Sequence, residues 1–547
     1  MAADRTRLSI PTADFATLRE NKQIYVDKTA LLAPLAQING AYFLSRPRRF
    51  GKSLLLSTFA DLFQNGLSNF SHLHIEQTWK ESKDYFVLKL NFASYQRNSI
   101  EIFTQNFCYD LISRFHAQCQ GLRPYSMPIF FPNLVLSHYL SQLPSYKLVL
   151  LIDEYDSPIT HTFQDKNLQK SIIDILASFF TVLKEFSHKC RFVFITGITR
   201  IAHVSLFSDV NFIKGITFDD QYSNLLGITQ DEIYTYYDDY VAEAADILDT
   251  TKEDVYAKLK EQYDGYKFST KAKETVYNPW SLINFFQSED KKFKNYWYES
   301  AGTPTLLINY IDKNSADENN TDSIPFFIKQ NFIGRKNFIE EIPYLELERK
   351  SSIGEIPCIP LLVQTGYLTI KDHDPVNVTL KIPNDEVYFS LILLSLQSSK
   401  IKISRETSYS LNSIEKLIDS ENIEGLVKVF NQILTEVSTP NSIFFENENS
   451  VRDIIYSMIP EDSIFKTREN PNAFGYSDLE LRTKKTRLCI EFKRSYKGKT
   501  ENKALAQGIE QIRKRDYACS NQPTLRYAMA ISTKKRAITC FEKFLID

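Results

Sequence analysis

Cysteine is scarce in this sequence, and the few cysteines are scattered. There are seven among 547 residues, an odd number, and no two of them have a CxxC spacing. This argues against a disulfide framework and against a zinc site built on paired cysteines. It favours reduced structural thiols, and therefore a cytoplasmic location.

The sequence also lacks an excess of charge of either sign, and it lacks a long apolar run. The formal net charge is -2, so a prediction of nucleic-acid binding must rest on local clusters. No apolar run approaches the ~20 residues needed to span a bilayer. The N-terminal residues lead into no apolar core, so we expect no signal peptide and no membrane partner. Internal repeats and extended low-complexity tracts are absent as well.

Aromatic residues, in contrast, are abundant. The chain has 30 Tyr and 39 Phe, which argues against wholesale disorder. Hydrophobic residues make up 43% and charged residues 24%, the balance of an ordinary soluble globular protein. The length predicts roughly two to four domains.

A nucleotide-binding pattern stands near the N-terminus. Residues 41–45 form a short apolar run, residues 46–53 read Arg-Pro-Arg-Arg-Phe-Gly-Lys-Ser, and residues 54–63 have helical periodicity. A P-loop needs this order of strand, loop and helix, in which backbone N–H groups cradle phosphates. Lys52 would then reach the outer phosphates, and Ser53 would join the magnesium shell. The alternative is a basic loop that caps a helix, because the usual first glycine is absent.

A second motif strengthens the P-loop prediction. Residues 147–156 form an apolar strand that ends in acids. Asp153 would lie at its carboxyl end, where it can bind magnesium through water, and Glu154 can polarise the attacking water. Residues 85–91 form another apolar run between the two motifs. That run predicts the strand that the additional-strand class of ATPases has between the P-loop strand and the acidic strand.

A further apolar run, residues 191–200, ends in polar residues. Thr196 or Thr199 could sense the γ-phosphate there. Arg200 could neutralise charge at the same place, and a surface salt bridge is an equal alternative. The amphipathic segment 171–180 suits a crossover helix of a parallel sheet.

Near the C-terminus, two short strand-like runs cover residues 475–481 and 488–493. Alternation along a strand puts Glu491 and Lys493 on one face. Two carboxylates, Asp478 and Glu491, beside an ammonium can hold a hard divalent cation and stabilise charge on a phosphate. Alone, such a pattern is more often a solvated sheet face.

The middle of the chain is predicted to be mainly helical, with Thr229 and Glu232 forming a capping box. The aromatic, turn-rich segments 263–268 and 276–280 suit either a hinge against the nucleotide site or a satellite core, and we favour the core. Residues 361–370 and 378–382 predict a β-hairpin, a candidate wing of a winged-helix module.

Several long motifs together point to a family. They are Tyr25-Val-Asp-Lys-Thr29, residues 46–53, Leu151-Ile-Asp-Glu-Tyr-Asp-Ser-Pro158, Tyr263-Asp-Gly-Tyr-Lys-Phe268, Tyr277-Asn-Pro-Trp-Ser281 and Ile382-Pro-Asn-Asp-Glu-Val387. The chain resembles, over nearly its whole length, the AAA-ATPase-like proteins with a C-terminal PD-(D/E)XK nuclease domain. In that family an arginine-rich loop replaces the glycine-rich start. The resemblance implies that Arg46, Arg48 and Arg49 contact phosphates beside Gly51; the alternative is that they face solvent or a partner.

The nuclease resemblance extends to single residues. Asp478 matches the first acid of the motif, with Ser477 where the name has proline, and Glu491-Phe-Lys493 matches the (D/E)XK element. The resemblance implies that Asp478, Glu491 and the Phe492 carbonyl hold Mg²⁺ or Mn²⁺. Lys493 would position the water or stabilise the pentavalent charge.

Two flanking helices complete this resemblance. Glu448 matches the acid of the first helix and a further metal ligand, with Glu446 as the alternative. Val451 and Arg452 occupy the places where relatives usually carry an aromatic residue and a His or Gln. Gln511 matches a helix position that faces the site in relatives. Basic residues nearby would bind backbone phosphates, unless they form a solvated face: Arg482, Lys484, Lys485, Arg487, Arg494, Lys497 and Lys499.

The resulting prediction is an α/β protein of three domains. Residues 1–222 would form an additional-strand P-loop ATPase with a parallel sheet. Residues 223–440 would form a helical lid and a candidate winged-helix module, and residues 441–547 a restriction-endonuclease-like α/β domain. The predicted function is ATP binding and hydrolysis coupled to metal-dependent cleavage of DNA, with RNA the second choice, in a protein that can form homo-oligomers. The alternative is a nucleotide-dependent switch or scaffold whose nuclease-like domain binds nucleic acid or protein without cleavage.

Overall fold

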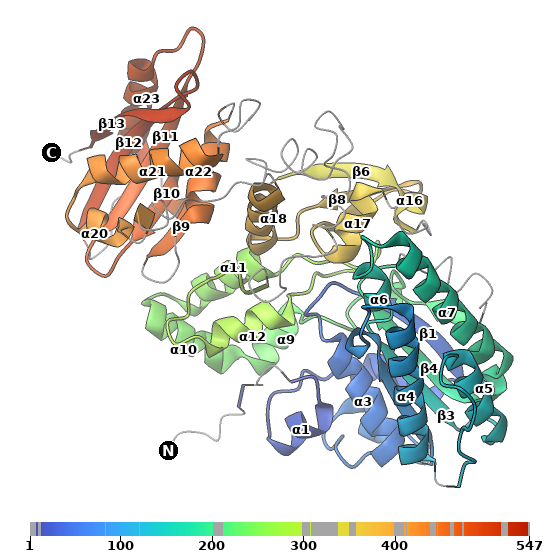
Figure 1. The fold of residues 1–547 in the computed structure, drawn as a ribbon. Coiled ribbons are helices and arrows are strands. Elements are labelled where there is room, and N and C mark those ends of the chain that lie inside the picture. The colour runs from blue at the N-terminus through green and yellow to red at the C-terminus, as the bar shows by residue number, and fades with distance from the viewer. Residues whose placement is uncertain are drawn as a thin grey trace. The chain divides into compact units, whose positions relative to one another are not determined.

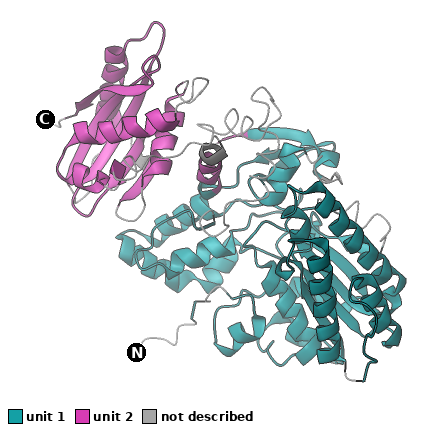
Figure 2. Ribbon diagram, viewed as in Figure 1, with its two compact units in different colours: residues 1–310, 339–386 teal, residues 311–338, 387–547 magenta. Residues whose placement is uncertain are grey.

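The computed structural model describes the chain from Arg7 to Phe544 with gaps. The gaps are residues 9–11, 82–83, 120, 201–211, 298–306, 308–336, 349–356, 399–409, 412, 438–444, 446, 460–463, 473–474 and 516–522. The chain divides into two compact units, coloured separately in Figure 2. Unit 1 comprises residues 1–310 and 339–386, and unit 2 comprises residues 311–338 and 387–547. The three-domain division stays a prediction beside this one.

A five-stranded parallel sheet organises unit 1, with the strand order β2-β3-β4-β1-β5 (Figure 1). The strands are β1 (Gly40–Ser45), β2 (Phe86–Asn91), β3 (Leu148–Asp153), β4 (Cys190–Gly197) and β5 (Ile213–Gly215). Parallel strands are buried on both faces, which explains the nearly continuous apolar runs in the sequence. The predicted parallel sheet is confirmed.

The strand inserted between the P-loop strand and the acidic strand is β4. β1 pairs with β4, and β4 pairs with β3, whereas β2 lies at the edge of the sheet beyond β3. The prediction that residues 85–91 supply the inserted strand is therefore wrong. Order along the chain does not decide pairing here, because every connection in a parallel sheet is a crossover.

Helices cover both faces of this sheet. Leu150 and Ile152 of β3 pack with the helices of one face: α4 (Ile100–Gln118), α5 (Pro132–Gln142) and α7 (Lys166–Glu185). Val149 and Leu151 pack with those of the other face: α1 (Phe15–Glu20), α2 (Thr29–Gln37) and α3 (Lys52–Asn65). The predicted crossover helix lies within α7. Short helical turns complete this layer: α6 (Ser157–Thr160), η1 (His74–Gln77), η2 (Phe92–Ser94), η3 (Ser187–Lys189) and η4 (Asp220–Tyr222).

A helical region with its own aromatic core follows the sheet. Its helices are α9 (Gln230–Tyr236), α10 (Asp238–Leu248), α11 (Lys252–Tyr263) and α12 (Pro279–Gln287). The capping box of Thr229 and Glu232 is confirmed at the start of α9. Asn278 caps α12, and Pro279 occupies its first turn, where the missing N–H of proline has no cost.

A small antiparallel sheet completes unit 1. Its order is β6-β8-β7, with β6 (Ile339–Pro343), β7 (Thr369–His373) and β8 (Asn377–Lys381), beside α16 (Tyr344–Glu348) and α17 (Cys358–Thr365). The predicted hairpin is confirmed for β7 and β8. Its first part is wrong, because residues 361–365 are helical and Gly366 ends α17 with φ 90°.

Unit 2 contains a five-stranded sheet of order β13-β12-β11-β10-β9. The strands are β9 (Phe465–Asn472), β10 (Gly475–Arg482), β11 (Arg487–Ser495), β12 (Thr524–Ser532) and β13 (Ala537–Lys543). The helices are α18 (Asp385–Ser398, which begins in unit 1), α20 (Ile414–Asp419), α21 (Ile423–Val437), α22 (Glu448–Met458) and α23 (Glu501–Arg515). β9, β10 and β11 form an antiparallel meander, and α23 connects β11 to the parallel β12. In the described ranges, no helix is long and apolar enough to cross a bilayer.

Candidate functional sites

The first candidate site begins where β1 ends and α3 starts. Residues 46–51 form the connecting loop, and Gly51 caps α3 with φ 87°. A left-handed backbone of this kind favours glycine, which explains Gly51 at the turn into the helix. The helix N-terminus therefore offers free N–H groups at the point where the pattern predicted phosphate binding.

Lys52 and Ser53 open this helix. Lys52 is buried, and its ammonium donates to the backbone carbonyls of Arg46 (2.9 Å) and Pro47 (2.8 Å). Burial lowers the pKa of Lys52 to about 8, although the charge of Asp153 acts in the opposite direction. Ser53 Oγ donates to Asp153 Oδ2 at 2.5 Å. The structure thus brings together the lysine, the hydroxyl and the carboxylate that a P-loop site requires.

The end of β3 is held by two threonines of the neighbouring β4 segment. Thr196 Oγ1 donates to Asp153 Oδ1 at 2.7 Å, which fixes that carboxylate toward Ser53. Thr199 donates through its N–H (2.8 Å) and its hydroxyl (2.7 Å) to Asp156 Oδ2. Asp156, which the sequence analysis missed, is buried, and that burial raises its pKa.

Glu154 lies between these acids and lines a pocket. Its backbone has φ 49°, a left-handed conformation that is uncommon for glutamate. Burial and the neighbouring charge of Asp153 raise the pKa of its carboxyl. A half-buried carboxylate with a raised pKa is suited to accept a proton from a water molecule.

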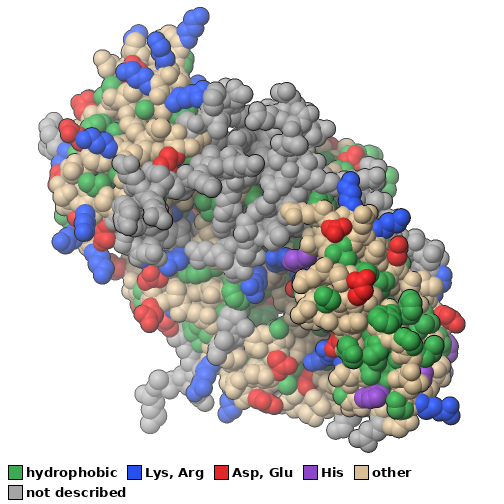
Figure 3. All heavy atoms as spheres, viewed as in Figure 1, with side chains coloured by type: hydrophobic (Ala, Val, Ile, Leu, Met, Phe, Trp, Pro, Cys, Tyr) green, Lys and Arg blue, Asp and Glu red, His purple; other side chains and the backbone are tan. Residues whose placement is uncertain are grey.

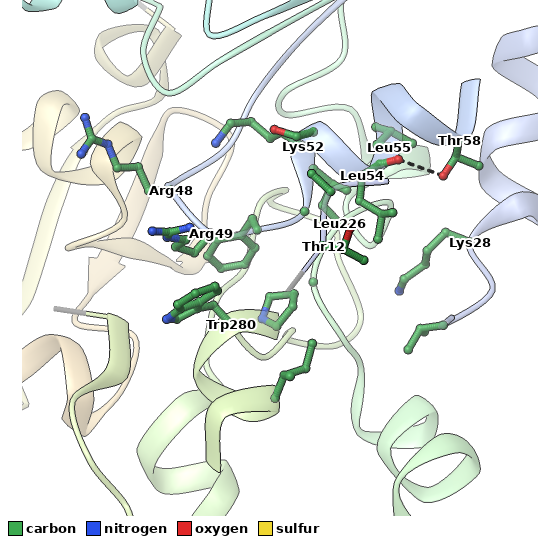
Figure 4. A pocket seen from close by; sticks show the side chains of 18 of the residues that line it. Thr12, Lys28, Arg48, Arg49, Lys52, Leu54, Leu55, Thr58, Leu226 and Trp280 are labelled. Carbon is green, nitrogen blue, oxygen red and sulfur yellow. Dashed lines mark hydrogen bonds between the residues drawn. The ribbon is translucent and has the colours of Figure 1, made fainter. Parts of the chain in front are cut away.

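The three arginines of the loop have different surroundings. Arg46 is buried and donates to the carbonyls of Ser45 and Thr217 (3.0 and 2.7 Å) and of Tyr222 (3.2 Å). It is not among the residues that line the pocket, so it anchors the loop from behind. Arg48 lines the pocket. Arg49 is exposed, lines the pocket and stacks on the ring of Trp280 at 4.2 Å (Figure 4).

The pocket itself has a volume of about 530 Å³, within the usual range of small-molecule sites. The P-loop residues 48–53 form one wall, and the segments 24–26 and 225–228 contribute apolar side chains. In Figure 4, Leu226 and Thr12 lie near the start of α3, while Arg48 lies farther along the loop. Lys28 lies on the side of the pocket opposite Arg48, so cationic side chains stand on both sides of the apolar ones.

The second candidate site lies on β10 and β11 of unit 2. Leu479 pairs with Ile490, so the register places Asp478 beside Glu491 on adjacent strands. The Phe492 N–H donates to Asp478 Oδ2 at 2.8 Å. Glu491 has no exposed surface.

Lys493 Nζ is the centre of this site. It lies 2.7 Å from Glu491 Oε1, 3.0 Å from the Phe492 carbonyl, 3.7 Å from Glu448 Oε1 and 3.9 Å from Asp478 Oδ2. All four donors predicted to hold a metal therefore converge on one cation. Hard oxygen donors arranged around a positive charge fit Mg²⁺ or Mn²⁺.

Comparison with known proteins identifies the two domains that carry these candidate sites. Residues 9–207 match the family model described as "Predicted AAA-ATPase", and residues 446–539 match the model of the PD-(D/E)XK nuclease superfamily. The chain joins an AAA-ATPase-like domain to a PD-(D/E)XK nuclease-superfamily domain. It is also 26% identical over 528 residues to an uncharacterized protein in the vnfD 5' region of Azotobacter chroococcum mcd 1. That similarity covers 94% of this chain and 93% of the relative, so it extends through the segment between the two matched domains.

The electrostatics of the nuclease-superfamily domain follow from the central ammonium. Burial and the charge of Glu491 raise the pKa of Asp478 to about 7. Burial alone would lower the pKa of Lys493, but the two carboxylates outweigh it and raise that pKa. Among the described residues, no three Asp, Glu, His or Cys side chains are grouped as a metal cluster. The charge of Lys493 compensates the acids.

The flanking helices carry the other residues predicted for the nuclease-superfamily site, and only Glu448 has a contact with Lys493 among the contacts described here. Glu448 is the first residue of α22, which Asn447 caps. Gln511 lies on α23, three residues after Gly508. A Cβ added at Gly508 would stand 3.5 Å from Lys493 Cγ. The alternative acid, Glu446, lies outside the described residues. Arg452 was not assigned a role, yet its charge lowers the pKa of Asp478.

Three of the basic residues predicted to bind phosphates have surroundings that distinguish them. The prediction that Arg487 binds phosphate is wrong, because its guanidinium donates two 2.7 Å hydrogen bonds to the buried Glu480 carboxylate. Arg494 and Lys499, in contrast, lie 5.5 and 5.7 Å from the ring centroid of Tyr496, whose side chain is 53% exposed. On the face shown in Figure 3, the Lys and Arg side chains of the described residues are interspersed with Asp and Glu.

The aromatic motifs of the middle region support the ATPase-like domain more directly than predicted. Tyr277 does belong to the satellite core. The rings of Tyr266 and Phe268, however, pack edge-on against Phe50 of the P-loop at 4.8 and 5.3 Å. The Trp297 indole N–H donates to the Arg48 carbonyl at 3.3 Å. Unusual aromatic density around Gly265 was the available signal for this contact.

Proposed function

We propose that this protein binds and hydrolyses ATP, and that its nucleotide state controls metal-dependent cleavage of nucleic-acid phosphodiesters, DNA in preference to RNA. The observation that carries the proposal is the convergence of Glu491, Asp478 and the Phe492 carbonyl on Lys493 Nζ. A solvated sheet face would not bury a carboxylate fully and gather acids from two strands and a helix around one cation.

In the ATPase-like domain, the chain's own groups have separate tasks. The N–H groups at the start of α3 and the Lys52 ammonium bind the phosphates, and Arg48 and Arg49 extend the cationic wall. Ser53 and Asp153 would hold Mg²⁺, which neutralises phosphate charge when bound. Glu154 orients a water molecule and accepts its proton.

In the nuclease-superfamily domain, Asp478, Glu491 and the Phe492 carbonyl would hold a divalent cation, with Glu448 as a further ligand. When bound, that ion polarises the scissile phosphate and lowers the pKa of a water molecule. Lys493 then donates to the phosphate oxygens as their charge increases. Gln511 orients the water or the phosphate from α23.

The test is cleavage of plasmid DNA, linear duplexes, single strands and RNA by purified protein with ATP and Mg²⁺ or Mn²⁺. We expect cleavage that Asp478→Ala and Lys493→Ala abolish, with circular dichroism unchanged. Glu510→Ala is a matched control, because Glu510 is an exposed acid of α23 that pairs only at the surface with Lys514. Failure of the wild-type protein to cleave every substrate would reject the nuclease half of the proposal.

A second candidate function is binding without cleavage, and one observation favours it. The Lys493 ammonium pairs with Glu491 and compensates the charge of the carboxylates, which supports a binding role that needs no metal ion. If the protein is a nucleotide-controlled clamp, wild type and Glu491→Ala would bind nucleic acid or protein with the same affinity. Lys52→Ala would abolish that binding. A loss of binding in Glu491→Ala whose circular dichroism matches wild type would exclude this candidate.

Self-association and a cytoplasmic location are further parts of the proposal. Met127, Phe130, Phe131 and Leu134 expose apolar surface at and before the start of α5, which supports assembly of several copies. Analytical ultracentrifugation with and without ATP tests it. Buried free thiols at Cys108, Cys119, Cys190 and Cys489 support a reducing compartment.

A further inference from the structure

Arg97 is a charged residue at the nucleotide pocket to which the P-loop pattern assigns no role. It follows β2, whose last residue, Asn91, pairs with Asp153 at the end of β3. The loop after β2 therefore starts at the sheet edge that carries Asp153 and Glu154. Because carboxyl ends of parallel strands share one edge, residues of this loop reach the same ligand.

The loop is held firmly before Arg97. Tyr95 is buried, its hydroxyl donates to Asp110 Oδ2 at 2.8 Å, and its ring stacks on Phe107 with 5.0 Å between the centroids. Arg97 is thus two residues from a fixed point, which limits where its side chain can go.

The guanidinium is held at the pocket by Ser157, close enough to Glu154 to feel its charge. Arg97 Nη1 donates to Ser157 Oγ at 2.9 Å, and Arg97 lines the same pocket as Lys52 and Glu154. Burial lowers the pKa of Arg97, and the charge of Glu154 acts in the opposite direction. A half-buried arginine next to the proposed water-orienting acid has the charge that a transferring phosphoryl group requires.

Arg200, the other arginine considered for this task, is placed differently. The backbone N–H of Arg200 donates to Gln364 Oε1 at 2.9 Å. The Arg200 guanidinium lies 5.6 Å from the ring centroid of Phe218. Arg200 is not among the residues that line the pocket.

We propose that Arg97 contacts the terminal phosphate of ATP and acts as a catalytic arginine from within the same chain; this rests on the proposed ATPase function. Water attacks the γ-phosphorus, and its proton passes to Glu154. The bond from the γ-phosphorus to the β,γ-bridging oxygen breaks, and ADP leaves with that electron pair. Arg97 neutralises charge on the γ-oxygens during transfer, and phosphate is the second product.

The primary test is steady-state ATP hydrolysis by full-length Arg97→Ala. Loss of a preorganised charged donor lowers kcat by about 100-fold or more, whereas KM changes much less. Arg97→Lys restores part of the rate, because it keeps the charge and loses the planar fork. An unchanged kcat in Arg97→Ala overturns the proposal.

Ser157→Ala is the matched control for a purely structural role. It removes the acceptor of the Arg97 hydrogen bond and leaves the guanidinium free to reach phosphate. We expect most of the turnover to remain. If Ser157→Ala and Arg97→Ala lose turnover equally, Arg97 acts by holding Ser157, and the proposal is wrong.

A mixing experiment separates action within one chain from action on a neighbour. Lys52→Ala and Arg97→Ala proteins, each strongly impaired alone, show no gain in turnover when mixed if Arg97 serves its own pocket. Recovery of turnover in the mixture would show that Arg97 serves a neighbouring copy, and this overturns the proposal.

Binding measurements distinguish failure of this inference from failure of the proposed ATPase function. Fluorescent ATPγS and ADP are titrated into wild type and Arg97→Ala. Arg97→Ala lowers the affinity for ATPγS and leaves that for ADP unchanged, even if wild type proves unable to hydrolyse ATP. An equal loss for both nucleotides refutes contact with the terminal phosphate, and absence of all binding by wild type refutes both proposals.

Discussion

Replacement of Lys493 by methionine tests the charge balance of the nuclease-superfamily site. The substitution keeps most of the side-chain volume and removes the ammonium from between Glu491 and Asp478. Glu491 is fully buried, and the Lys493 side chain is only 13% exposed. Removal of one partner from a buried pair costs about 3–5 kcal/mol, because the remaining charge is uncompensated. Partial exposure of Lys493 and Asp478 places the expected cost at the lower end, about 3 kcal/mol.

Hydrogen–deuterium exchange of the β10 and β11 amides measures this cost locally, which avoids treating a multidomain chain as a two-state system. In EDTA, a loss of about 3 kcal/mol corresponds to roughly 150-fold faster exchange. Lys514→Met is the control, since the Lys514–Glu510 pair is 72% and 60% exposed. Pairs of that kind contribute at most about 1 kcal/mol.

A metal ion should rescue the variant. Mn²⁺ at 100 times its Kd stabilises a binding-competent fold by about 2.7 kcal/mol, so it should return most of the lost protection to Lys493→Met. Wild type should gain less, because the ion must displace the ammonium. Equal exchange of wild type and variant in EDTA, or equal gain of both with Mn²⁺, would refute this account of the site.

Three further variants test other contacts. Arg46→Ala removes the donor to three backbone carbonyls, and a hydrogen bond from a charged group contributes about 1.5–3 kcal/mol. Arg46 does not line the pocket, but its loss should loosen the loop. Calorimetry should therefore show weaker ATP binding. Gly366→Ala places a Cβ 2.7 Å from Pro47 Cβ at φ 90° and should lower both Tm and ATP affinity; Gly121→Ala, at φ 91° with open space, isolates the backbone strain of about 1–2 kcal/mol. Tyr496→Ala should weaken binding of single-stranded oligonucleotides by about 1–3 kcal/mol in anisotropy titrations if the ring stacks on a base, whereas Tyr496→Phe should not. Equal effects of Gly366→Ala and Gly121→Ala, or of Tyr496→Ala and Tyr496→Phe, would contradict these assignments.

The sequence predicted those parts of the sites that are written in short local patterns. The apolar run before residue 46, the turn at Gly51 and the helix after it are neighbours in the chain, and so are the strand of residues 148–153 and its terminal acids. Glu491 and Lys493 share a face because strand alternation is local.

Contacts between distant segments were not predictable in this way. Arg46 was expected to contact phosphates or to face solvent or a partner, but carbonyls from residues 217 and 222 and the ring of Phe268 bury it. The place of β4 between β1 and β3 likewise depends on crossover connections rather than on order along the chain. Arg487 is a different case, because its partner Glu480 is seven residues away on the adjacent strand, and the hairpin register would have revealed it.

The position of the aromatic residues around the P-loop has a practical consequence for spectroscopy. The chain has three tryptophans. Trp280 stacks on Arg49 and Trp297 bonds to the Arg48 carbonyl, whereas Trp79 is buried against Phe63. The indoles of Trp280 and Trp297 therefore report on the loop of residues 46–51, and that of Trp79 serves as an internal reference. Intrinsic fluorescence can follow nucleotide arrival in the unlabelled protein, and Trp280→Phe and Trp297→Phe would separate the two signals.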